Sequence, residues 1–163
     1  MAWLGKVKNK YKITSGWVHG TPLSFDKFDS SKIKEQGFGK GIYFTTSADE
    51  AKIYAKKGQL VEIDPANLNI LDAEKSPQVI QKIADNLGMP LLNNDKKAMY
   101  NLWDSYGSHF KDDSGSHLPD AITKEIMKLG YDGTSFDPGT SATSRWLVVY
   151  SADKLKIKKR RKA

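Results

Sequence analysis

The chain has 163 residues, of which 39% are hydrophobic and 28% are charged, a composition and length that suit one globular domain and exclude a disordered chain. It contains no cysteine, which excludes disulfides, cysteine-based zinc sites and thiol nucleophiles. No apolar run reaches the roughly 18 residues of a membrane span and no signal peptide opens the chain, so we expect a soluble protein without a membrane partner.

The net charge of +7 is concentrated near one end of the sequence. Seven of the 26 basic residues lie between positions 154 and 162, and the other 19 balance the 19 acidic residues. We therefore expect residues 1–157 to form the domain and residues 158–163 to form a basic tail. Such a tail is either a solvated end or a segment that docks on phosphate groups or a partner.

The first predicted elements are strands. Alternation over residues 6–12 and the apolar pair at 17–18 predict one or two strands that end at His19. Three glycines between residues 36 and 41 predict a loop, and residues 42–45 are typical of a short buried strand.

A capping box predicts the first helix. Ser47 can accept a hydrogen bond from the backbone N–H of Glu50, and the Glu50 carboxylate can reach back to the start of the helix. Tyr54 then lies on the apolar face of this helix. Strands are predicted over residues 60–63 and 68–71, on either side of an Asp-Pro break.

Further helices are predicted in the middle of the chain, before the last strands. The helices are expected over residues 76–88, around residues 99–103 and over residues 119–130. The strands are expected over residues 131–136, 146–150 and 155–157. Strands at both ends and helices in the middle predict an α+β fold rather than a repeating βαβ sheet.

Three motifs in order resemble the NAD-binding signature of the diphtheria-toxin and poly(ADP-ribose)-polymerase superfamily of ADP-ribosyltransferases. The first is Trp-Val-His-Gly-Thr at residues 17–21, and the second is Gly-Phe-Gly-Lys-Gly-Ile-Tyr-Phe at residues 37–44. The third is Tyr54, eleven residues after Tyr43. Each feature taken singly is typical of a turn or a core position, but their joint spacing favours the family. The chain resembles the His-Tyr-Glu type, and in particular its bacterial and phage toxin-like members.

The resemblance implies a split β-sheet fold with helices inserted between the N-terminal and C-terminal strands, and NAD+ as a substrate. It implies that Tyr43 and Tyr54 sandwich the nicotinamide ring, a flat cation that aromatic faces attract. The Gly20 backbone would hold the carboxamide, and His19 a ribose hydroxyl. The implied NAD+-binding residues are His19, Gly20, Thr21, Gly41, Tyr43 and Tyr54. We expect no metal site.

The sequence departs from the family pattern at one position. Active members carry a glutamate at the start of a strand of the type Glu-Tyr-Val-Val-Tyr, and here Trp146 takes that place. Three alternatives stay open. The domain transfers without the glutamate, or a carboxylate such as Asp137 or Glu62 replaces it, or the domain is an inactive binder. We group Trp146 with His19 and the two tyrosines as the catalytic candidates.

The resulting hypothesis is a mono-ADP-ribosyltransferase, because chain elongation in the family depends on the missing carboxylate. By resemblance it is a toxin or effector that modifies a host macromolecule in the cytoplasm of a host or target cell. The expected partners are a protein or nucleic-acid target and an antitoxin or immunity protein, and we expect a monomer. The alternatives are an inactive module that binds NAD+ or ADP-ribose, and a transferase acting on nucleic acid, which the basic tail favours.

Overall fold

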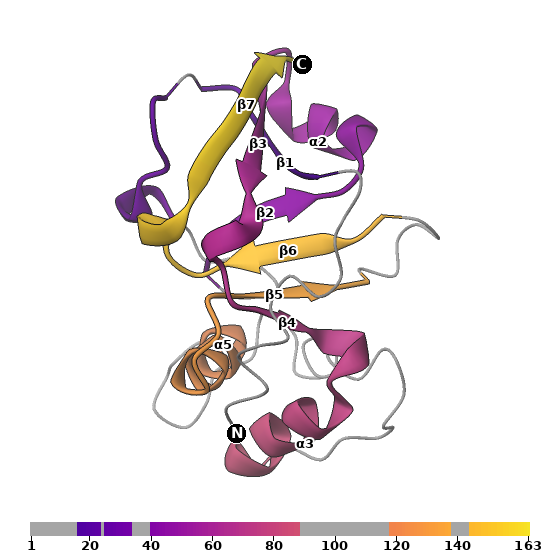
Figure 1. Ribbon diagram of the computed structural model, residues 1–163, viewed down its shortest axis with the longest axis vertical. Coiled ribbons are helices and arrows are strands. Elements are labelled where there is room, and N and C mark those ends of the chain that lie inside the picture. Colours follow the sequence, from indigo (N-terminus) through magenta and orange to yellow (C-terminus); the bar gives the residue numbers. More distant parts are fainter. Residues whose placement is uncertain (1–15, 24, 34–39, 89–117, 138–143) are drawn as a thin grey trace.

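The computed structural model describes residues 16–163 except for residues 24, 34–39, 89–117 and 138–143. Within these residues it forms a seven-stranded sheet with three α-helices (Figure 1). The strands are β1 (Trp17–Thr21), β2 (Ile42–Thr45), β3 (Gln59–Asp64), β4 (Ile70–Asp72), β5 (Gly133–Phe136), β6 (Trp146–Val149) and β7 (Lys156–Lys162). The helices are α2 (Ala48–Ala55), α3 (Pro77–Asn86) and α5 (Leu118–Lys128), and short 3₁₀ turns lie at Ser30–Lys32, Pro65–Asn67, Ala73–Lys75 and Ala152–Lys154.

The strand order is β4-β5-β6-β2-β1-β3-β7, so the C-terminal strands β5, β6 and β7 lie beside the N-terminal strands β4, β2 and β3, respectively. Among the described strands only the β4–β5 pair is parallel. The predicted α+β class is therefore confirmed, as are the helices that become α2, α3 and α5. The strand predicted over residues 6–12 and the helix around residues 99–103 lie outside the described residues.

Strands β1 and β2, which are neighbours in the sheet, share the fewest paired residues of the described strands. These strands share one register pair, Val18 with Thr45, whereas β1 and β3 share five pairs and β2 and β6 share four. Figure 1 shows β3 and β7 crossing the direction of β5 and β6 at a steep angle. The pairing between β1 and β2 is thus the shortest among the described strands.

Apolar side chains cover both faces of the sheet. Helices α3 and α5 pack on one face, where the largest cluster forms because the inward positions of β4, β5 and β6 meet the apolar stripe of each helix. The opposite face carries a second cluster. The fully buried large side chains in the two clusters include Trp17, Phe44, Ile63, Leu68, Leu71, Ile80, Ile83 and Phe136.

Helix α2 begins as the capping box predicts, but only half of the box forms. Ser47 Oγ accepts from the backbone N of Glu50 at 3.2 Å. The backbone N of Ser47 donates to Thr45 Oγ1 at 3.1 Å instead of to Glu50. The Glu50 carboxylate therefore has no capping partner in its own helix, and it turns toward other elements.

Residues 158–162, which we expected to form a tail, belong to the edge strand β7. They pair with β3 from Gln59 to Glu62, and after a register shift Ile157 lies opposite Ile63. A backbone ladder needs no apolar side chain on the added strand, so a run of lysine and arginine can complete the edge of a sheet. Charged residues on an edge strand also oppose pairing with another chain.

Candidate functional site

A cavity of about 700 Å³ lies between β1, β2 and α2, with Trp146 of β6 at one end. Its volume falls within the range of small-molecule sites, roughly 300–1,000 Å³. The structure brings to this cavity the residues that the sequence analysis named for NAD+ binding, together with Trp146: His19, Gly20, Thr21, Gly41, Tyr43, Tyr54 and Trp146. Three motifs separated along the chain thus converge on one place, beside the short β1–β2 contact.

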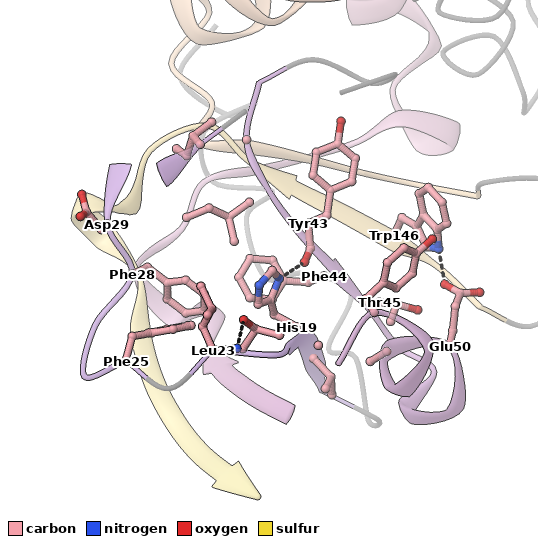
Figure 2. A pocket seen from close by; sticks show the side chains of 18 of the residues that line it. His19, Leu23, Phe25, Phe28, Asp29, Tyr43, Phe44, Thr45, Glu50 and Trp146 are labelled. Atoms are coloured by element: carbon pink, nitrogen blue, oxygen red, sulfur yellow. Dashed lines mark hydrogen bonds between the residues drawn. The ribbon is translucent and has the colours of Figure 1, made fainter. Parts of the chain in front are cut away.

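His19 is fixed in one orientation by its neighbours. Its Nδ1 lies 2.7 Å from the carbonyl oxygen of Tyr43, which can only accept (Figure 2). The ring also packs against Phe28 and Phe44, with centroid distances of 5.5 and 5.7 Å. Burial lowers the pKa of His19, and the bond to the Tyr43 carbonyl opposes that shift in part. A neutral ring with its proton on Nδ1 presents Nε2 as an acceptor, which suits a hydroxyl donor in the cavity.

The two tyrosines reach the cavity from different elements. Tyr43 lies in β2 with its side chain half-buried at the edge of the larger core cluster. Tyr54 lies near the end of α2 and is 58% exposed. An exposed aromatic ring at the mouth of a cavity is available for stacking on a flat ligand.

Gly20 and Gly41 are needed for close packing, a role that the sequence analysis did not predict. A Cβ on Gly20 would lie 1.8 Å from the carbonyl oxygen of Ala51, so glycine here lets α2 pack directly on β1. A Cβ on Gly41 would lie 2.4 Å from Val148 Cγ1. Thr21 is buried, and its hydroxyl oxygen accepts from the backbone N of Leu23 at 3.1 Å, which holds the turn after β1.

Trp146 is the first residue of β6, opposite Thr45 in β2. Its side chain is half-buried, and its ring meets Phe136 edge-on with centroids 6.3 Å apart. Its indole N–H donates to the Glu50 carboxylate (Figure 2). Trp146, which the resemblance places at the family glutamate, is therefore an indole that contacts a carboxylate from another element.

Glu50 is the cavity residue that the sequence analysis missed as a functional candidate. Its Oε1 accepts from Trp146 Nε1, and its Oε2 accepts from Ser144 Oγ at 3.3 Å. Glu50 and Tyr54 both line the cavity from one face of α2, as their spacing of four residues dictates. That spacing was visible in the sequence, but the capping box gave the carboxylate another expected partner.

The two carboxylates that the sequence analysis offered as replacements do not line the cavity. Glu62 lies on β3, where its side chain approaches Gly16. Asp137 follows β5, and its backbone N donates to Glu74 Oε1 at 2.5 Å. The prediction that either could replace the family glutamate is therefore not supported by their positions.

Arg145, which precedes Trp146, is paired away from the cavity. Its guanidinium donates to Glu74 Oε2 at 2.8 Å and lies 3.5 Å from Asp72 Oδ1. Burial raises the pKa of Asp72, while the positive charge of Arg145 acts against that shift. Two neighbouring carboxylates therefore offset the positive charge of Arg145.

In the described part of the chain, no three or more histidine, aspartate or glutamate side chains gather in a way that could hold a metal ion. The helices of that part include none that is both long and apolar enough to cross a membrane.

The comparison with protein families identifies the superfamily to which the chain belongs. Residues 17–160 match the family model described as ADP-ribosyltransferase in polyvalent proteins. The chain is therefore a member of the ADP-ribosyltransferase superfamily, and within it of this family. ADP-ribosyltransferases use NAD+ as their substrate. None of the curated proteins compared with the chain matches it. Among solved structures, an anti-CRISPR protein is similar, with 12% identity and a TM-score of 0.47 over 87% of this chain and 92% of that one.

Proposed function

We propose that the protein binds NAD+ in the cavity between β1, β2 and α2 and transfers its ADP-ribose as a single unit to a macromolecular target. The observation that carries this proposal is the convergence of all three family motifs on one cavity. A dinucleotide is long and polar at its centre, and a cavity that opens beside two β-strands offers it both aromatic faces and backbone groups.

The residues support specific contacts. The neutral His19 ring accepts a hydrogen bond from a ribose hydroxyl through Nε2, since its Nδ1 is engaged with the Tyr43 carbonyl. Tyr43 and Tyr54 hold the nicotinamide ring between them, and the Gly20 backbone holds the carboxamide. We interpret the single β1–β2 register pair as the split in the sheet that characterises this fold. We propose transfer of a single ADP-ribose unit because chain elongation in the family depends on the glutamate. The resemblance places Trp146 at that position.

The role of the transfer is proposed from the resemblance to toxin-like members. The protein acts as a toxin or effector on a macromolecule of a host or target cell, in the cytoplasm, where NAD+ is available. An antitoxin or immunity protein would then be its natural partner.

A second candidate has one observation in its favour. The six basic residues of β7 are exposed along the edge of the sheet, and Lys27 lies both at the cavity and in the groove along β7. A row of positive charges next to the cavity suits a phosphate backbone, so nucleic acid is the alternative target.

Incubation with NAD+ labelled on the adenylate part, with and without a cell lysate, tests the proposal. We expect release of nicotinamide and label on one class of macromolecule. Digestion of the products with protease or nuclease separates a protein target from a nucleic-acid target. NAD+ binding without nicotinamide release under either condition would contradict the transfer and support an inactive binding module.

A further inference from the structure

Cleavage of NAD+ places positive charge on the nicotinamide ribose, and a carboxylate beside that charge lowers the barrier. Trp146 carries none. Two carboxylates from the described residues line the cavity, those of Asp29 and Glu50. These two carboxylates are the candidates, among the described residues, for the group that replaces the family glutamate.

Asp29 is used to hold a turn. Its Oδ1 accepts from the backbone N of Ser31 at 2.9 Å and from Ser31 Oγ at 2.8 Å, so it caps the 3₁₀ turn at Ser30–Lys32. The side chain is exposed, and Figure 2 shows it at the opposite end of the cavity from Trp146. Its position does not match the start of β6, where the family places its carboxylate.

Glu50 lies where that carboxylate is needed. The indole of Trp146 donates to Oε1 and Ser144 donates to Oε2, so the first residue of β6 and a residue just before this strand hold a carboxylate that comes from α2. Ser47 Oγ accepts from the backbone N of Glu50 and not from its side chain. The Glu50 carboxylate is therefore left to face the cavity. The tryptophan thus occupies the family position and brings a carboxylate to it.

We propose that Glu50 is the catalytic carboxylate of this transferase, and that Trp146 and Ser144 are the positioning residues that aim it at the nicotinamide ribose. This inference rests on the proposed function and names the group that carries its chemistry. Glu50 accepts a hydrogen bond from the ribose 2′-hydroxyl and stabilises the positive charge that develops at C1 and the ring oxygen.

The step balances without a further reactant. The bond between C1 of the ribose and the nicotinamide nitrogen breaks, and its electron pair leaves with nicotinamide, which becomes neutral. A hydroxyl or amine of the target, or water, forms the new bond to C1 with a lone pair. The proton of that nucleophile passes to solvent. Glu50 forms no covalent bond in this step.

The Glu50→Gln variant tests the proposal, with Glu62→Gln as the matched control outside the cavity. Glutamine keeps the length of the side chain and an oxygen for the Trp146 N–H, so we expect an unchanged melting temperature. NAD+ affinity, measured by calorimetry, should stay within about twofold, while nicotinamide release from NAD+ should fall by about 10²- to 10³-fold. Glu62→Gln should release nicotinamide at the wild-type rate.

The outcomes separate this inference from the proposed function. A wild-type protein that binds NAD+ but releases no nicotinamide, alone or with lysate, overturns the proposed function together with the role of Glu50. An active wild type with an equally active Glu50→Gln variant overturns the role of Glu50 alone. A variant whose loss of rate is matched by its loss of NAD+ affinity would make Glu50 a binding residue and also overturn the proposal.

Trp146→Phe tests the positioning role. It removes the N–H donor and keeps an aromatic wall, so nicotinamide release should fall while NAD+ affinity is retained. In the Glu50→Gln background the same substitution should cause little further loss, because the two residues act through one group. Additive losses in the double variant would show that Trp146 acts independently of Glu50 and would overturn this part.

Discussion

His19 Nδ1 lies 2.7 Å from the carbonyl oxygen of Tyr43, and so a side chain joins β1 to β2 where the backbone ladder between them has one register pair. The bond holds these two strands together at the wall of the cavity. It also fixes which ring nitrogen of His19 faces the ligand. The orientation of the ring and the continuity of the sheet therefore depend on the same contact.

The first prediction concerns stability against pH. Burial lowers the pKa of His19 in the folded protein below the value of 6.5 that is usual for histidine. The unfolded chain therefore binds a proton at a higher pH than the folded chain, and the free energy of unfolding falls as the pH drops below about 6.5. At pH 7 and above this loss is absent. His19→Gln should lack this component, and denaturant unfolding of both proteins between pH 5 and pH 8 measures it. Parallel curves would contradict the prediction.

The second prediction concerns Tyr54. Since its ring is 58% exposed, Tyr54→Ala should leave the melting temperature unchanged and weaken NAD+ binding by about 1–2 kcal/mol through lost stacking. The preceding residue, Ile53, is 72% exposed and does not line the cavity, so Ile53→Ala is the matched control. Calorimetry should show a weaker affinity for the tyrosine variant only. If Tyr54→Ala and Ile53→Ala bound NAD+ with equal affinity, Tyr54 would not be part of the binding site.

The third prediction concerns Gly20. A methyl group at this position would lie 1.8 Å from the Ala51 carbonyl oxygen, so Gly20→Ala should push α2 away from β1. We expect a loss of about 1–3 kcal/mol in the free energy of unfolding. Denaturant unfolding in the absence of NAD+ measures the packing effect by itself. A variant as stable as the wild type would show that α2 adjusts without cost.

The fourth prediction concerns β7. Truncation after Ile157 removes the strand residues that pair with β3 from Gln59 to Glu62, so it should lower the melting temperature by several degrees, since about 1 kcal/mol corresponds to 2–4 °C at this size. Replacing Lys158 and Arg161 by glutamine keeps the backbone ladder and the hydrogen bond from Arg160 to the Asp26 carbonyl, so it should leave the melting temperature unchanged. The glutamine variant also tests the nucleic-acid alternative, because its binding to nucleic acid should depend less steeply on salt. A truncated protein of wild-type stability would show that β3 does not need its edge partner.

The residues that line the cavity could be predicted because three motifs resemble the NAD-binding signature of a known family, and the resemblance implies that they meet. The local patterns by themselves predict only strand ends and a helix, since the pairing that brings β1 and β2 together joins separate segments of the chain. Glu50 could not be found in this way. Its partners Trp146 and Ser144 lie 96 and 94 residues away, and its own helix offered a competing role as a cap.

The sequence analysis expected a strand at residues 155–157 but not its continuation to Lys162 in β7. Residues 158–162 have neither the alternation nor the apolar content that indicates a strand, and charge alone is typical of a solvated end. The pairing of β7 depends on the free edge of β3, which is a property of the assembled sheet.

The strand order has a kinetic consequence. β6 lies between β5 and β2, and Tyr43 faces Val148 in that pairing, which closes a loop of about 100 residues. Contacts so distant in sequence form late and slowly, on the scale of milliseconds to seconds for sheets dominated by them. We therefore expect the wall that holds Trp146 against Glu50 to be among the last parts of the cavity to form. During refolding, the proposed NAD+ binding by β1, β2 and α2 should then return before the proposed release of nicotinamide, which needs Glu50 held in place.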